Sequence, residues 1–208
     1  MKIRTGFVSN SSSSSFLVIY RSIEDFNRFS GFVELPNLIR DLSTSTAEKV
    51  FGFVKGLICS DGYDSYYKYT SNYRDVHELT PTFCQLQELV LLSGADDSKY
   101  CEWRGKINTA GFTFYREHDV ANVTYVYDKD WYRAYDAAWL DTISKELDVI
   151  ASALARDIVD RLAAGGYTTA CVEYEDHDDY GCYMEHDFMP MIAADADHKI
   201  SVITINNH

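Results

Sequence analysis

The C-terminal quarter of the chain gathers side chains that could bind a metal ion or transfer protons. Glu185, His186 and Asp187 are consecutive, and the last residue of the sequence is His208. Imidazole nitrogen combined with carboxylate oxygen suits zinc, manganese or iron, and the same groups act as general acids and bases. The sequence thus offers Glu185, His186 and His208 as catalytic candidates, and His186, Asp187 and His208 as ligands for a divalent metal. A solvated acidic surface is the alternative, because the chain has no His-x-x-x-His, His-Glu-x-x-His or Cys-x-x-Cys spacing.

A serine run near the start of the chain is the second chemical candidate. Its hydroxyl and backbone N–H groups could hold a phosphate or another oxyanion, with Lys2 and Arg4 supplying positive charge. The candidate anion-binding residues are Ser11, Ser12, Ser13, Ser14 and Ser15. The run lacks the glycines and the lysine of a nucleotide phosphate loop. The alternative is a structural turn whose hydroxyls cap nearby backbone groups.

The stretch from Gly6 to Phe16, Gly-Phe-Val-Ser-Asn-Ser-Ser-Ser-Ser-Ser-Phe, resembles the opening of a group of uncharacterised bacterial and bacteriophage proteins. In that group the stretch follows a basic residue. The resemblance implies a cytoplasmic setting in a bacterium or a phage-infected cell and carries no particular reaction.

The C-terminal region is similar to the same group. An acidic turn with glycine, here Asp176 to Gly181, is followed by the Glu185-His186 pair, by the aromatic Phe188 and by a chain end at histidine. Asp187 stands where the group has glycine. The resemblance implies that the serine run and the Glu-His pair belong to one unit. We therefore expect the strand after the serines to pair in one sheet with the C-terminal strands, bringing Ser11–Ser15 near Glu185, His186 and His208.

Strands are expected where apolar and β-branched residues run together or alternate. Residues 16–20 predict a buried strand, and residues 111–115 with 122–127 predict a β-hairpin. Two further strands, 167–175 and 182–188, are expected on either side of the acidic turn, so that Glu185 and Asp187 share one face while His186 points to the other. Residues 200–205 predict the last strand.

Helices are expected where capping residues precede apolar positions three or four residues apart. Ser22 and Ser45 each open such a segment, the second running through Cys59, and Thr80-Pro81 opens a third that ends at Gly94. Residues 60–75, rich in tyrosine, predict a loop. Residues 129–164 predict one long helix that ends at Gly165-Gly166.

These elements predict an α+β fold with a mixed or mainly antiparallel sheet, a long helix in the C-terminal half and several shorter helices. The chain has 208 residues, 46% of them hydrophobic, and contains no linker rich in glycine or proline and no internal repeat. We expect one domain over residues 1–208. Five cysteines without a close pair are typical of a reducing cytosol, and no apolar run is long enough for a leader or a membrane span.

Composition limits the classes of partner. A formal net charge of −13 disfavours nucleic acid, whose binding needs clustered lysine and arginine. With no motif that requires catalysis, we expect an accessory protein, of phage or bacterial origin, that binds another protein through aromatic and acidic side chains. Two alternatives stay open: a small enzyme or ligand-binding protein that uses the serine run and the C-terminal Glu-His site, and a component of a virion or assembly.

Overall fold

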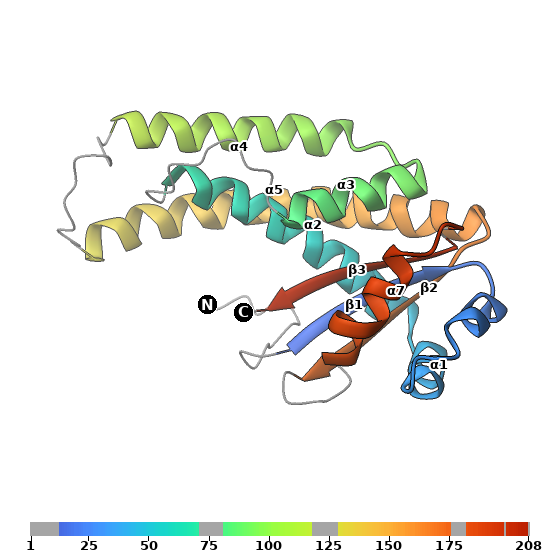
Figure 1. The fold of residues 1–208 in the computed structure, drawn as a ribbon. Helices are drawn as coiled ribbons and strands as arrows, with labels where there is room; N and C mark the ends of the chain where they lie inside the picture. Colours follow the sequence, from blue (N-terminus) through green and yellow to red (C-terminus); the bar gives the residue numbers. More distant parts are fainter. Residues whose placement is uncertain (1–12, 71–80, 118–128, 176–181, 198, 208) are drawn as a thin grey trace. The chain divides into compact units, whose positions relative to one another are not determined.

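A three-stranded antiparallel sheet joins one strand from the N-terminal part of the chain to two strands from its C-terminal part (Figure 1). A computed structural model describes residues 13–70, 81–117, 129–175, 182–197 and 199–207. Strand β1 (Ser13–Tyr20) lies between β2 (Thr168–Glu175) and β3 (Ile200–Asn207). Phe16 is opposite Val172 on one side and Thr204 on the other. The expected pairing of the N-terminal strand with two C-terminal strands is thereby confirmed.

Helices make up most of the rest of the described chain, and the fold is α+β as predicted. The longest, α5, spans Lys129–Ala164. The others are the 3₁₀-helix η1 (Ile23–Phe29), α1 (Leu35–Ser43), α2 (Ala47–Thr70), α3 (Pro81–Ser93), α4 (Ser98–Glu117), the π-helix η2 (Met184–Phe188) and α7 (Met189–Ala193). No helix within these described segments is both long and apolar enough to cross a membrane.

Contacts group the chain into two compact units. The first, which we call the sheet unit, contains residues 1–54 and 158–208, and the second, the helical unit, contains residues 55–157. The boundaries fall inside α2 and α5, so each of these helices contributes residues to both units. The expectation of a single domain stays a prediction.

The core of the sheet unit is built on one face of the sheet. Phe16, Val18 and Tyr20 alternate along β1 and are buried against side chains of η1, α1, η2 and α7. Phe188 is central to this cluster: its ring lies 5.0 Å from that of Phe32, 5.6 Å from Phe29 and 6.2 Å from Phe26. Leu17 and Ile19 are buried on the opposite face, which explains why the strand reads as a continuous apolar run.

Several element ends follow the sequence signals. The Ser22 hydroxyl caps η1 by accepting a hydrogen bond from the Glu24 N–H, and the Asp25 carboxylate accepts one from the Ser22 N–H. At the end of α5, Gly166 has φ of +77°, a conformation that glycine adopts without strain. The Tyr167 N–H donates to the Leu162 carbonyl and the Gly166 N–H to that of Ala163, which is the Schellman pattern. Gly94, with φ of +65°, closes α3.

Three predicted elements are wrong. Residues 111–115 belong to helix α4, and 122–127 lie outside the described residues. The apolar residues of 111–115 also continue a helical spacing that starts at the buried Tyr100, Trp103 and Ile107. Residues 60–70 extend α2 because Asp61 and Gly62 pack inside the helical unit, while 71–75 lie outside the described residues.

The predicted strand 182–188 is helical. Met184 and Phe188, four residues apart, are the two buried residues of η2, and this spacing places both on one side of a helix. Glu185 is half-buried, while His186 and Asp187 are both exposed. The expected division, with Glu185 and Asp187 on one strand face and His186 on the other, is therefore also wrong.

Candidate functional site

The last serines of the run belong to β1. Ser13, Ser14 and Ser15 are strand residues, and the prediction of a turn is wrong for them; Ser11 and Ser12 lie outside the described residues. Ser14 is 7% exposed and Ser15 is 1% exposed. Because neighbouring strand residues face opposite ways, these two hydroxyls cannot act together on one anion. The Ser15 hydroxyl is buried without a hydrogen-bond partner among the described residues.

Ser14 and Glu185 are brought together as the sequence led us to expect. The Ser14 hydroxyl Oγ donates to Oε1 of Glu185 over 2.9 Å. Met184 and Phe188 on either side of Glu185 are buried in the aromatic core, which fixes the carboxylate against the end of β1. One carboxylate oxygen is thereby used to hold η2 on the sheet.

The other C-terminal candidates do not join this pair in the described structure. His186 and Asp187 point away from the buried side of η2 and are exposed, and His208 lies outside the described residues. Among the residues described, no three His, Cys, Asp or Glu side chains are grouped as a metal site would require. The catalytic and metal roles of these residues stay predictions.

Two segments of the sheet unit meet at the rings of Phe32 and Tyr183, a contact that the sequence did not reveal. The rings of Phe32 and Tyr183 meet edge to face with centroids 6.4 Å apart. Phe32 is buried, while Tyr183 is 38% exposed and Val33, the next residue after Phe32, is 79% exposed. We call the contacting rings of Phe32 and Tyr183, together with the exposed Val33 that follows Phe32 in the chain, the Phe32–Tyr183 face. Once η2 is known to be helical, Tyr183 falls outside the buried positions Met184 and Phe188.

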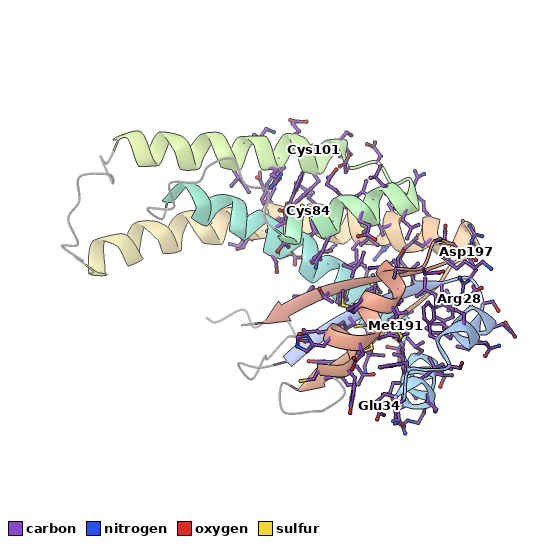
Figure 2. All side chains as sticks on the ribbon, viewed as in Figure 1. Arg28, Glu34, Cys84, Cys101, Met191 and Asp197 are labelled. Atoms are coloured by element: carbon purple, nitrogen blue, oxygen red, sulfur yellow. The ribbon has the colours of Figure 1, made fainter. Side chains whose placement is uncertain are left out.

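Carboxylates are frequent in the two segments that contain Phe32 and Tyr183. Residues 29–39 and 182–197 contain Glu34, Glu185, Asp187, Asp195 and Asp197 and no lysine or arginine. Arg28 lies between Asp195 and Asp197, at 2.8 and 3.2 Å, and within 3.9 Å of Asp25 (Figure 2). Figure 2 also shows Glu34, the residue before α1, and Met191 on α7. Glu34 accepts a hydrogen bond from the Asn37 amide over 2.7 Å, and Arg40 donates to Oδ1 of the same Asn37 over 3.0 Å.

The helical unit holds a buried charged network that sequence reasoning also missed. Asp61 on α2 is fully buried, and its carboxylate accepts from the Tyr100 hydroxyl at 2.8 Å and from Arg104 Nε at 3.0 Å, both on α4. The Arg104 guanidinium stacks 3.9 Å above the Phe83 ring of α3. Burial raises the pKa of Tyr100, and the negative charge of Asp61 adds to the rise.

This network joins three helices and explains their packing. Asp61 follows the buried Leu57 and Ile58 at helical spacing. A carboxylate at a buried helix position is the one sign of this network in the sequence. A buried carboxylate requires a cation and hydrogen-bond donors, and α4 supplies both. The arrangement fixes the register of α2 against α4.

Comparison of the chain with protein-family models, with curated proteins and with solved structures found no match.

Proposed function

We propose that the chain is an accessory protein that binds another protein through the Phe32–Tyr183 face, in a bacterial or phage-infected cytoplasm. The observation that supports this proposal is the exposure of Tyr183 on the ring of the buried Phe32, with Val33, the residue after Phe32, exposed as well. Apolar side chains exposed singly are common on protein surfaces, but Tyr183 stands on a cluster of packed rings.

Rigid support favours binding. Phe32 is held by Phe188 at 5.0 Å and in turn packs against Tyr183 at 6.4 Å. A partner that covers Val33 and Tyr183 would therefore order little of the chain on binding, which lowers the entropic cost of association. Tyrosine also offers a hydroxyl at the rim of an apolar contact, a combination enriched where proteins bind each other most tightly.

The proposal is tested by selecting binders from a displayed library of random 12-residue peptides on the immobilised full chain. We expect a set of peptides whose binding is lost in Val33→Asp and in Tyr183→Ala. Leu91→Asp is the matched control, because Leu91 on α3 is 80% exposed, as Val33 is 79% exposed, yet belongs to the helical unit. Peptides that bind all three variants equally, or no selected peptides, would contradict the proposal.

A further inference from the structure

We infer that Cys84 on α3 and Cys101 on α4 form a disulfide when the protein meets a peroxide, and that this bond clamps the two helices together. Both helices belong to the helical unit, so the inference is independent of the binding proposed above. Neither thiol is in a disulfide and both are exposed, which makes them accessible to an oxidant in solution. Figure 2 shows both side chains on the two neighbouring helices.

Two contacts between these segments set the level of each cysteine in the helical hairpin. Gln87 on α3 donates to Oδ2 of Asp97, the residue before α4, over 3.4 Å. The Arg104 guanidinium of α4 lies 3.9 Å from the centre of the Phe83 ring of α3. Because the later residue of α3 meets the earlier residue of the second segment, the helices run antiparallel. Each cysteine lies in the sequence between the two contact residues of its own segment, so the two occupy the same level of the hairpin.

The Cys101 side chain is turned toward α3. Its Sγ donates to Oδ2 of Asp97 over 3.3 Å, and the same oxygen accepts from the Gln87 amide, so the sulfur and the amide meet at one atom. Cys84 is three residues before Gln87, a spacing that makes them neighbours on the surface of α3. Facing positions on helices packed about 8–10 Å apart have Cα atoms within the span of a disulfide, which reaches about 7 Å. Closing the bond therefore needs rotation of the two side chains and little movement of the helices.

The reaction uses one hydrogen peroxide for each bond. The first thiolate attacks the O–O bond and becomes a sulfenic acid, and the oxygen that leaves is released as water. The second thiolate attacks the sulfenic sulfur and forms the S–S bond, and the hydroxide that leaves takes up a proton as a second water. Two thiols thus lose two electrons and two protons in total. Partial loss of solvent and the hydrogen bond to Asp97 raise the pKa of Cys101, so we expect Cys84 to be oxidised first and Cys101 to complete the bond.

The bond would act on the stability of the helical unit. It closes the stretch of chain between residues 84 and 101, which restricts the unfolded chain and so favours the folded one. In a reducing cytosol the pair returns to two thiols, because exposed disulfides are the easily reduced ones. The pair is therefore a reversible clamp that responds to the redox state of its surroundings.

Peptide mapping after oxidation tests the inference. The full chain is treated with a small excess of hydrogen peroxide, its remaining thiols are blocked, and tryptic peptides are analysed by mass spectrometry without reduction. Trypsin cuts after Lys99, between the two cysteines, so the disulfide joins two peptides. We expect these joined peptides in the monomer and their separation by dithiothreitol. The thermal midpoint of tryptophan fluorescence, which reports on the helical unit, should rise by about 5–10 °C.

Serine variants provide the controls. Cys84→Ser and Cys101→Ser should each abolish the joined peptides and the rise in the midpoint. Cys182→Ser should change neither, because Cys182 is an equally exposed cysteine of the sheet unit. In Cys101→Ser the sulfenic acid on Cys84 should persist and be trapped by dimedone, since the thiol that completes the bond is missing.

Three results would overturn the inference. The first is peroxide treatment that leaves both thiols free or oxidises Cys84 to a sulfinic acid with Cys101 present. The second is a disulfide from either cysteine to Cys59 or Cys182 in place of the joined pair. The third is a bond found only between two chains, seen as a covalent dimer on a non-reducing gel. A joined pair with an unchanged thermal midpoint would refute the clamping effect.

Discussion

The hydroxyl of Ser14 donates to the carboxylate of Glu185 over 2.9 Å, joining two residues that lie 171 positions apart in the chain. Ser14 is near the start of the central strand, and Glu185 is on the π-helix that covers one face of the sheet. π-Helical turns are rare, and they occur often at functional sites. Here the turn both holds Glu185 on the sheet and leaves Tyr183, His186 and Asp187 accessible.

Replacing Ser14 with alanine removes the donor and leaves Glu185 half-buried without it. We expect Ser14→Ala to lower the free energy of unfolding of the sheet unit by about 1–2 kcal/mol, as for other hydrogen bonds to a charged group. The three tryptophans lie between residues 103 and 139, inside the helical unit, so their fluorescence does not report this change. Amide hydrogen exchange of Phe16 to Ile19, in the sheet unit, measures this loss of stability.

Ser15→Ala is the matched control for that experiment. Ser15 adjoins Ser14 in the same strand and is buried even more fully, but its hydroxyl has no partner among the described residues. Removing a buried, unpaired hydroxyl should leave stability unchanged or raise it. Equal loss of protection in both variants would show that the Ser14–Glu185 bond contributes nothing to stability.

The network around Asp61 gives a prediction for the helical unit. Asp61→Asn removes the negative charge that pairs with the Arg104 guanidinium. Removing one partner of a buried ion pair lowers the free energy of unfolding by about 3–5 kcal/mol. Tyr100→Phe should cost about 1 kcal/mol, because it removes one hydrogen bond to the carboxylate. Urea unfolding followed by tryptophan fluorescence measures both.

The control for Asp61→Asn is an ion pair on the surface of α4. Glu102 and Lys106 are 2.9 Å apart, with side chains 70% and 71% exposed. Glu102→Gln should have no measurable effect, because exposed pairs contribute little and are screened by salt. If Glu102→Gln and Asp61→Asn shift the urea midpoint equally, burial of Asp61 does not determine the stability of the network.

What the sequence could predict depends on whether local signals agreed with packing. Strand 16–20 and helix 129–164 were found because apolar periodicity and end signals pointed the same way. Residues 182–188 were assigned wrongly because Tyr183, Glu185 and Asp187 alternate with Met184, His186 and Phe188, while the four-residue spacing of Met184 and Phe188 decides the structure. The tyrosine-rich segment after Cys59 was taken for a loop because the tertiary contacts of Asp61 and Gly62, which support its helix, leave no local signal in the sequence.

The candidate site was predictable only in part for the same reason. The pairing of Ser14 with Glu185 followed from the expectation that both chain ends share a sheet, and the structure places them in contact. The exposure of Val33 and Tyr183 depends on which side of η1, α1 and η2 faces the sheet. That choice is made by packing of Phe26, Phe29, Phe32 and Phe188 and leaves no short sequence signature.

Replacing Ser45 and replacing Thr46, the two residues before α2, should affect hydrogen exchange differently. Sequence reasoning placed the cap at Ser45, but the Lys49 N–H donates to Thr46 Oγ1 over 3.3 Å, while Ser45 Oγ accepts from the Cys171 N–H of β2 over 2.8 Å. Both Thr46→Ala and Ser45→Ala should lower stability by about 1 kcal/mol. Only Ser45→Ala should speed hydrogen exchange at the Cys171 amide. Faster exchange there in Thr46→Ala as well would mean that the whole start of α2 detaches from β2.

Thiol reactivity tests the burial of the cysteines and its pH dependence. Burial raises the pKa of Cys171 and of Cys59 to about 11, while Cys84 and Cys182 are exposed. At pH 8 only about one in a thousand of the Cys171 and Cys59 thiols is ionised, and the thiolate is the reactive form. Iodoacetamide should therefore label Cys84 and Cys182 first. Mass spectrometry of labelled peptides against time measures the order, with protein in 8 M urea as the control in which all five react.

The raised pKa of Cys171 predicts how the stability of the folded chain depends on pH. In the unfolded chain the Cys171 thiol ionises around its ordinary value of 9.0, whereas in the folded chain it stays protonated up to about 11. The contribution is therefore fully present below pH 9 and is lost as the pH rises from 9 to about 11. Cys171→Ala should remove the loss of stability between pH 9 and 11 that is due to this thiol. Urea unfolding followed by circular dichroism between pH 8 and 11 measures the free energy of unfolding of both proteins. Hydrogen-exchange protection of β1 at pH 8 gives the starting stability of each. Identical pH profiles for the two proteins would show that the thiol is already ionised, or already exposed, in the folded chain.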